Sequence, residues 1–415
     1  MVPANAISAM QEDKINHQQD HSYSMPSSLK QEDGRIWQDR NLQIIFAITL
    51  MAVMGVASIT PAFPKIIKEL RIPPHNIGLL ITAFTVPGVF LTPVLGVLAD
   101  RFGRKRILAP SLFLFALAGG ACAFSQNFHA LLILRFLQGI GAAALGSLNA
   151  TLIGDLYVGS ELGAAMGWNA SVLSLGTASY PALGGVLAAA GWQYPFLLPL
   201  LAIPVGLLVL FVLQNPEPKN SQPLSGYLRG IWKVLHNRQV AGLFIATLAI
   251  FIILYGSYLT YLPLLLNHSF KASSVVIGLI MSGMSCTMAL TAAQMGRLTK
   301  IYAKKTMIQA AFVLYALSLL LIPFVSQLWL LLLPIALFGA AMGINVPCLQ
   351  TMLAGLAPLE YRGAFMSVNG MVLRLGQTLG PLLMGAVFAG YGINGVFYAG
   401  AACSLLMVLA IAALL

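Results

Sequence analysis

Long apolar runs alternate with short polar segments along most of this chain. A helix needs about 20 apolar residues to cross the hydrocarbon core of a bilayer. Twelve runs approach or exceed that length, at residues 42–62, 75–99, 106–125, 129–153, 164–189, 193–213, 239–266, 273–298, 304–325, 328–353, 362–389 and 393–415. The pattern therefore predicts an all-α integral membrane protein with twelve transmembrane helices.

Two polar segments divide the chain into parts. The first, residues 1–40, lacks the basic-then-apolar order of a signal peptide and predicts a disordered cytosolic tail. The second, residues 214–238, carries prolines and charges between the sixth and seventh apolar runs and predicts a cytosolic linker. The predicted domains are a six-helix bundle at residues 41–213 and another at residues 239–415.

Composition agrees with a membrane protein. Of the 415 residues, 58% are hydrophobic and 8% are charged, against roughly 25% charged in soluble domains. The net charge of +11 does not indicate a nucleic-acid partner, because the basic residues lie in loops between apolar runs. The four cysteines fall inside apolar runs and predict no disulfide framework.

The basic residues also predict orientation. If the N-terminus is cytosolic, most Lys and Arg residues fall in inside segments, and the outside segments hold only Lys65, Lys68, Arg71 and Lys271. Basic residues gather on the cytoplasmic side of membrane proteins. Both termini are therefore predicted in the cytosol, with the chain in the inner or plasma membrane.

An internal repeat relates the two predicted bundles. A shift of 200 residues superposes, without a gap, Gly96 on Gly296, Gly139 on Gly339, Asn169 on Asn369, Gly176 on Gly376 and Pro181 on Pro381. Glycine, proline and asparagine in register over so long a stretch predict two pseudo-symmetric bundles.

The loop between the second and third runs carries the most specific motif. It matches Gly-x-Leu-x-Asp-Arg-x-Gly-Arg-(Lys/Arg) at Gly96, Leu98, Asp100, Arg101, Gly103, Arg104 and Lys105. This loop resembles that of the major facilitator superfamily of secondary transporters. The resemblance covers roughly residues 40–415 and implies two six-helix bundles that rock around a central site.

In relatives this loop makes a charge network with the fourth and eleventh helices. The resemblance implies that Arg101 or Arg104 pairs with Asp155, and that Asp100 lies at the start of the eleventh helix, near residues 362 and 363. Such contacts would hold the cytoplasmic side closed in the outward-facing state. The second copy of the loop has Lys300 in place of Asp100, so the two gates are not equivalent.

Two further motifs resemble transporter patterns. Arg135, Gln138, Gly139 and Gly141 are similar to the Arg-x-x-Gln-Gly-x-Gly motif of the fourth helix, which implies a role in proton coupling. A purely structural role of Arg135 and its snorkelling to the outer surface are the alternatives. The antiporter-type pattern of small residues and proline appears in the fifth and eleventh helices at Gly176, Pro181, Gly184, Gly185, Gly376, Gly380 and Pro381. Tyr180 replaces one glycine of that pattern, and plain helix packing is an equal interpretation.

Acidic residues are missing from the middle of every apolar run, whereas Arg374 lies near the midplane of the eleventh. A cavity with arginine and without an acid favours an anionic or polar neutral cargo. In the alternative, Arg374 bonds Gln377 or backbone carbonyls and never meets cargo. Other candidate cavity residues are Asn149, Asn169, Asn345, Gln350, Asn369, Gln377, Tyr255 and Tyr258.

These observations predict a secondary transporter that exports a small organic molecule, with protons as the coupling ion. It resembles the twelve-helix drug and metabolite antiporter branch and is expected to act as a monomer in the bilayer. The alternatives are import of a small organic anion and a membrane sensor that does not transport. We predict no enzyme activity, cofactor or metal site, because no phosphate loop, nucleophile triad or metal cluster is visible.

Overall fold

The computed structural model describes residues 36–214, 238–356 and 362–415, and these are helical with no strand. Residues 1–35 of the predicted tail and residues 215–237 of the predicted linker lie outside the described residues. Residues 36–40 form η2 (Ile36–Gln38), the Asp39 cap and the first residue of α2 (Arg40–Ala57), so the prediction of disorder is wrong for these five residues. The first bundle comprises α2 (Arg40–Ala57), α3 (Phe63–Leu70), α4 (Leu79–Phe102), α5 (Arg104–Ala121), α6 (Phe128–Leu156), α7 (Gly159–Ala190) and α8 (Ala202–Phe211). The second comprises α10 (Arg238–Ile252), the π-helix η7 (Ile253–Tyr261), α11 (Leu262–Phe270), α12 (Ser274–Ala293), α13 (Met295–Ile301), α14 (Lys304–Leu321), α15 (Leu332–Leu356) and α16 (Arg362–Leu414).

The predicted fold class is confirmed. Eleven helical stretches among the described residues are long and apolar enough to cross a membrane. The last of them contains two helices, because Gly392 interrupts α16 with a φ of 69°. A positive φ is readily adopted only by glycine, and this position falls between the predicted eleventh and twelfth runs.

Several helix ends are fixed by local chemistry. Asp39, Asn127 and Ser273 accept hydrogen bonds from backbone N–H groups in the first turns of α2, α6 and α12. Side-chain caps of this kind satisfy donors that have no partner within the helix. At the C-terminal ends of α3 and α11, Arg71 and Lys271 adopt the left-handed conformation. These two residues are 200 positions apart, so the repeat extends to backbone conformation.

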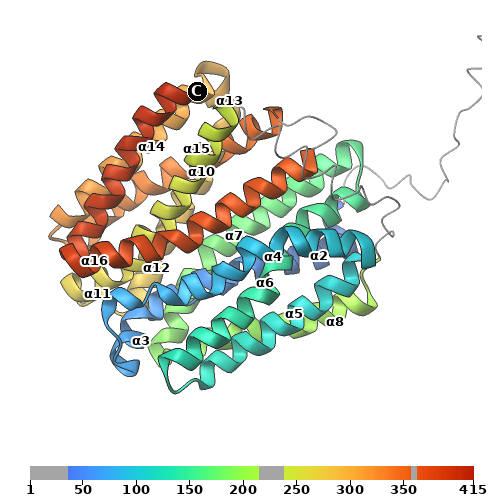
Figure 1. Cartoon of the computed structure of the whole chain (residues 1–415), viewed down its shortest axis with the longest axis horizontal. Helices are drawn as coiled ribbons and strands as arrows, with labels where there is room; N and C mark the ends of the chain where they lie inside the picture. The colour runs from blue at the N-terminus through green and yellow to red at the C-terminus, as the bar shows by residue number, and fades with distance from the viewer. Residues whose placement is uncertain (1–35, 215–237, 357–361) are drawn as a thin grey trace, which may run out of the picture.

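The bundles meet along α4 and α7 of the first and α12 and α16 of the second. Figure 1 shows them converging near α3 and α11 and spreading apart toward the other end. Close approach there needs glycine: a Cβ on Gly78 would lie 2.9 Å from Pro381 Cβ, and a Cβ on Gly278 would overlap the Pro181 carbonyl oxygen. The two pairs are related by the repeat.

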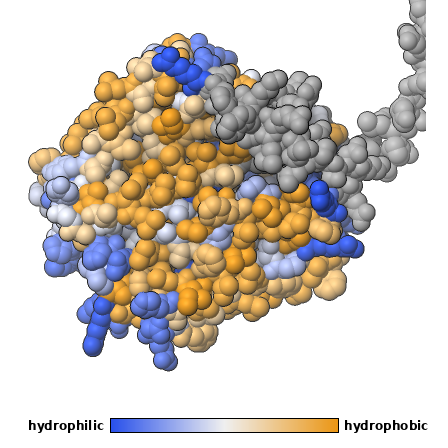
Figure 2. Space-filling model, in the orientation of Figure 1, coloured by the Kyte–Doolittle hydropathy of each residue, from blue (hydrophilic) through white to orange (hydrophobic). Residues whose placement is uncertain are grey.

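Large apolar side chains cover the outer surface of the helices. Phe90, Leu175, Leu290 and Leu406 are each at least 65% exposed. Figure 2 shows an apolar surface across the middle of the molecule with hydrophilic residues at its ends. Exposed apolar area of this extent is unusual for a soluble protein, and it fits a lipid-facing surface.

Candidate functional site

A central cavity lies between the two bundles. It has a volume of about 700 Å³ and is lined by α2, α4, α6 and α7 on one side and by η7, α10, α12, α15 and α16 on the other. Its lining extends from Phe84 and Pro181 to Thr151 and Met366. Drug-sized ligands occupy pockets of about 300–1,000 Å³, so a small organic molecule fits.

One end of the cavity is sealed by contacts between the bundles. Tyr261 Oη donates to the His75 carbonyl oxygen at 3.3 Å, and Thr82 Oγ1 donates to the Thr378 carbonyl oxygen at 3.1 Å. Gly185 packs against the backbone of Ser274 so closely that a Cβ would overlap it. We call this the sealed end; it lies on the side of residues 71–78 and 271–274.

The opposite end carries Gly96, Gly154, Gly296 and Gly355. A Cβ added at any of these glycines would meet nothing within 4 Å. This end also holds the loop around Gly103, and we call it the gate end. The cavity reaches toward it as far as Thr151 and Met366, and the described helices of the two bundles spread apart there (Figure 1).

Arg374 projects from α16 across the cavity to the first bundle. Its Nη1 donates to Gln377 Oε1 at 3.3 Å, and Gln377 Nε2 donates to Tyr255 Oη at 3.0 Å. A Cβ on Gly88 of α4 would lie 3.2 Å from Arg374 Cδ, and a Cβ on Gly146 of α6 would lie 3.4 Å from Nη2. Arg374, Gln377 and Tyr255 all line the cavity, so bonding to Gln377 does not remove Arg374 from it.

Arg135 is enclosed by protein and does not line the cavity. Its side chain has 0% exposure, so the snorkelling alternative is wrong. Nε donates to the Leu80 carbonyl oxygen at 3.2 Å, Nη1 donates to Gln138 Oε1 at 2.7 Å, and the guanidinium lies 4.3 Å from the centroid of the Phe84 ring. Nη2 is buried with no hydrogen-bond partner among the described residues. Arg135 thus ties α6 to α4.

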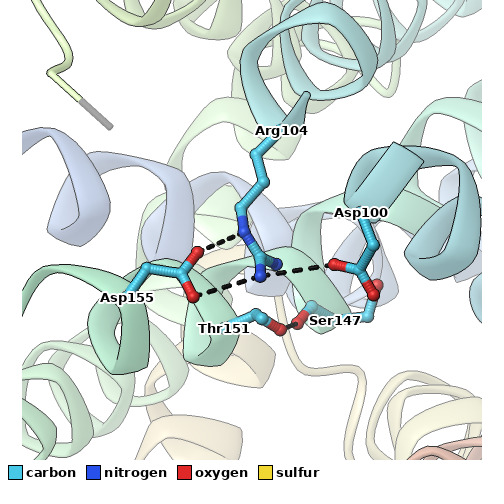
Figure 3. Close-up of polar contacts among 5 residues, drawn as sticks. All are labelled: Asp100, Arg104, Ser147, Thr151 and Asp155. Carbon is cyan, nitrogen blue, oxygen red and sulfur yellow. Dashed lines mark hydrogen bonds and ion pairs between the residues drawn. The ribbon is translucent and has the colours of Figure 1, made fainter. Parts of the chain in front are cut away.

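The gate loop forms its charge network within the first bundle. Arg104 Nη2 donates to Asp155 Oδ1 at 3.1 Å, and Arg104 Nε also contacts the Asp155 carboxylate (Figure 3). Asp100 Oδ1 lies 3.3 Å from Arg104 Nη2. Arg104 is buried, whereas Arg101 is exposed. The implied pairing with Asp155 is therefore made by Arg104. The contact implied for Asp100 at the start of the eleventh helix involves residues 362 and 363, whose side chains are not described.

Other parts of the loop fit its position between two helices. Gly103 has a φ of 95°, which explains why glycine is needed between α4 and α5. Lys105 is partly exposed. Tyr157 Oη donates to Asp39 Oδ2 at 2.6 Å; burial and this hydrogen bond raise the pKa of Tyr157 well above its usual range. Tyr157 therefore stays a hydrogen-bond donor at neutral pH.

Most of the predicted amide candidates lie within helix packing. Asn149 Nδ2 donates to Thr49 Oγ1, and Thr49 Oγ1 donates to Asn169 Oδ1 at 2.5 Å, which joins α6, α2 and α7. Asn345 is fully buried, and Asn369 is 7% exposed. The cavity lining does not include five of the predicted amides, namely Asn149, Asn169, Asn345, Gln350 and Asn369. Gln138 of the fourth-helix motif accepts a hydrogen bond from Arg135.

The predicted tyrosines behave differently from the amides. Both Tyr255 and Tyr258 line the cavity. Tyr258 stacks on Phe338 with ring centroids 4.8 Å apart and donates to the Met281 carbonyl oxygen at 3.3 Å. Tyr255 contacts Gln377 and through it Arg374, so it is the more polar contributor to the cavity.

The small residues of the antiporter-type pattern lie at close helix contacts. A Cβ on Gly184 would overlap the Ser58 carbonyl oxygen of the chain after α2. A Cβ on Gly376 would lie 2.7 Å from the Leu248 carbonyl oxygen, and a Cβ on Gly380 would lie 2.7 Å from that of Ile252. A Cβ on Gly176 would lie 3.0 Å from the Leu50 side chain of α2. These glycines allow helices to approach, as small residues do in membranes.

Sequence reasoning missed a group of methionines on one wall of the cavity, namely Met281, Met284, Met288, Met342 and Met366. Three of them recur at intervals of three and four residues on α12, which places them on one helix face. That spacing was a usable signal. It was not recognised because methionine is common in apolar helices.

The profile of the Major Facilitator Superfamily matches residues 45–270 and 256–415 of the chain. Over 384 residues the chain is 25% identical to the bacillibactin exporter of Bacillus subtilis (strain 168), with 88% of this chain and 94% of that protein covered. It is 26% identical over 358 residues to the class B tetracycline resistance protein of Escherichia coli, with 83% and 88% covered.

A solved structure shares the fold. The nucleoside transporter NupG superposes with a TM-score of 0.77 at 15% identity, with 91% of this chain and 100% of that chain covered. At that identity the likeness concerns the arrangement of helices. With the profile match over almost the whole described region, two six-helix bundles and a cavity between them, the chain is a member of the Major Facilitator Superfamily, a membrane transporter.

Proposed function

We propose that this protein is a secondary active transporter that exports a small organic molecule by alternating access. One observation carries the proposal: a cavity of about 700 Å³ lies between two bundles that are sealed against each other at one end. Rocking of the bundles would seal the gate end and open the other. The relatives include a bacillibactin exporter and a tetracycline resistance protein, which favours export.

The proposed orientation of the chain in the membrane rests on the distribution of its basic residues. With both termini and residues 214–238 in the cytosol, the gate end faces the cytosol. The structure then corresponds to an inward-facing state, in which an exporter takes up its cargo. The Arg104–Asp155 pair stays within the first bundle in this state, and it leaves Asp100 47% exposed and available to contact the second bundle on closure.

We further propose protons as the coupling ion. The antiporter-type pattern and the buried Arg135 support this assignment through family resemblance. No carboxylate lines the cavity among the described residues, so a direct exchange of proton and cargo on one acid is not available there. Import of a small organic anion remains the second candidate, since the same lack of an acid and the presence of Arg374 favour it.

Expression in a strain that lacks its own efflux pumps tests the proposal. We expect lower intracellular accumulation of at least one member of a panel of small organic molecules, and loss of that effect on addition of a protonophore. An Asp155→Asn variant at matched expression should export more slowly. Increased accumulation of an organic anion would instead establish import, and no change across the panel would contradict transport of such molecules.

A further inference from the structure

We propose that the cavity selects amphiphilic organic monoanions: Arg374 binds the single acidic group, and the methionine wall (Met281, Met284, Met288, Met342 and Met366) binds an apolar body. This inference rests on the proposed function, because it names the class of cargo for that same cavity. It also goes further, since it assigns the two parts of the cargo to two parts of the wall.

The guanidinium of Arg374 has no acidic partner in the part of the chain that the structure describes. Its Nη1 hydrogen bond goes to the neutral amide oxygen of Gln377, and no Asp or Glu lines the cavity among the described residues. A charge within a membrane is costly unless it is paired or hydrated. Arginine presents several donors in a planar arrangement that matches a carboxylate, sulfonate or phosphate group. A ligand acid therefore completes an otherwise unpaired site.

The position of Arg374 is set by glycines of the first bundle. The side chain lies against Gly88, at 3.2 Å from the place of an added Cβ, and its Nη2 lies 3.4 Å from that of Gly146. A larger residue at either place would push the guanidinium back toward its own helix. The missing side chains thus let an arginine of the second bundle reach the first, so an acid bound there contacts the interface that must move.

The methionine wall suits an apolar body of variable shape. Methionine is unbranched and polarizable, and it adapts to different ligands. Opposite this wall the first bundle presents small residues, among them Ala52, Val53, Ala57 and Ala150. Their small size leaves the volume of the cavity to the ligand.

The residues that line the cavity also indicate how many negative charges the ligand carries. Arg374 is the one Lys or Arg residue that lines the cavity in the part of the chain that the structure describes. A second acidic group on the ligand would lie among methionines and small apolar residues, where an unpaired charge is strongly disfavoured. A monoanion should therefore bind better than a dianion of the same skeleton, and also better than a neutral analogue.

A matched pair of fluorescent probes tests this directly in nanodiscs with the full chain. 1-Anilinonaphthalene-8-sulfonate carries one sulfonate, and N-phenyl-1-naphthylamine has the same ring system without it. After subtraction of empty nanodiscs, we expect Arg374→Gln to weaken binding of the sulfonate probe by about 10-fold or more. Binding of the neutral probe should change less than twofold, and Met288→Ala should weaken both.

Glycine variants give an independent control. Gly146→Ala should weaken binding of the sulfonate probe about threefold, because the new methyl group crowds Nη2. Gly154→Ala lies on the same helix in open space and should leave it unchanged. These variants, with Arg374→Lys, keep the test valid if Arg374→Gln fails to fold.

The inference is overturned if Arg374→Gln weakens both probes equally, or if the wild type does not prefer the sulfonate. The experiments distinguish a failure of this inference about the cargo from a failure of the proposed transport function. Sulfonate binding through Arg374 without any vesicle transport would refute transport alone. Transport of neutral molecules with no preference for the sulfonate probe would refute the cargo class alone.

Discussion

Arg135 and Arg374 place the same chemical group in two different regions of the molecule. Arg135 lies in the packed interface of α4 and α6, with 0% exposure, a carbonyl, an amide and an aromatic face around it. Arg374 lies in the cavity, with a neutral amide as partner and glycines beside it. Protein groups surround the guanidinium of Arg135 on all sides, whereas the guanidinium of Arg374 is accessible to a ligand in the cavity.

The difference indicates how a membrane-embedded arginine is assigned a role. Sequence alone marks both residues as costly within the bilayer. Only the surroundings distinguish an arginine that holds two helices together from one that contacts cargo. The four experiments below probe this contrast and the two ends of the cavity.

The largest effect is expected at Arg135. Arg135→Leu removes two hydrogen bonds and the contact with Phe84, and it leaves the buried Gln138 amide oxygen without its donor. We expect a loss of about 3 kcal/mol in the free energy of unfolding, measured in detergent. Arg374→Leu is the matched control and should cost less than about 1 kcal/mol. Equal losses would remove the contrast between the two arginines.

The gate pair should have the next largest effect. Asp155→Asn replaces the carboxylate that makes two contacts with the buried Arg104 by a neutral amide and leaves Asp100, at 3.3 Å from Arg104 Nη2, as its acidic partner. Charge-assisted hydrogen bonds contribute about 1.5–3 kcal/mol. We expect a loss of about 2 kcal/mol in the free energy of unfolding and slower transport. Lys300→Ala alters the exposed second-bundle counterpart of Asp100 and should change stability by no more than about 0.5 kcal/mol. A larger effect at Lys300 than at Asp155 would contradict control by the first loop.

The sealed end should respond to crowding between the bundles. In Gly278→Ala the new methyl group meets the Pro181 carbonyl oxygen, and overpacking costs about 1–3 kcal/mol. Distances between spin labels placed on the two bundles at this end, measured by electron paramagnetic resonance, should show a population in which the bundles lie farther apart. Gly283→Ala lies on the same helix, where the nearest atom would be 3.8 Å away, and should leave the distances unchanged. A similar shift in both variants would argue against a seal at Gly278.

The smallest effect is expected at Tyr255. Tyr255→Phe removes the acceptor of Gln377 Nε2, which in turn holds Arg374, and one hydrogen bond contributes about 0.5–1.5 kcal/mol. Affinity for a monoanionic probe should fall about threefold. Tyr258→Phe removes a hydroxyl that bonds the Met281 carbonyl and should not affect the preference for an anion. If the two variants act alike, the tyrosine does not position Arg374.

The number of membrane helices and the repeat were predictable, because bilayer thickness sets the length of each apolar run and the register of glycine and proline survives in the sequence. For the gate loop, the resemblance implied that Asp155 pairs with Arg101 or Arg104, and the structure identifies Arg104 as the partner. Which polar residues face the cavity was not predictable: Asn149 and Asn345 are packed between helices, whereas Tyr255 and Tyr258 line the cavity. Whether a side chain faces the cavity depends on the rotation of its helix about the helix axis. The positions of polar residues within an apolar run do not determine that rotation.

Contacts between the bundles were also missed. Arg374 was recognised as an unusual charge, but its approach to Gly88 and Gly146 depends on how α16 crosses α4 and α6. The hydrogen bond from Thr378 Oγ1 to Thr85 Oγ1, at 2.9 Å, likewise joins residues 293 positions apart. No local pattern in either helix indicates its partner.

Uptake into inside-out membrane vesicles tests the central claim most directly. The cargo is 1-anilinonaphthalene-8-sulfonate, and the vesicles contain either the wild type or Arg374→Gln at equal amounts. We expect the wild type to accumulate the probe above its external concentration when the vesicle interior is acidic, and a protonophore to abolish this. Arg374→Gln should lower the uptake about 10-fold. Uptake equal to that of protein-free vesicles, or equal uptake by the two proteins, would contradict the account.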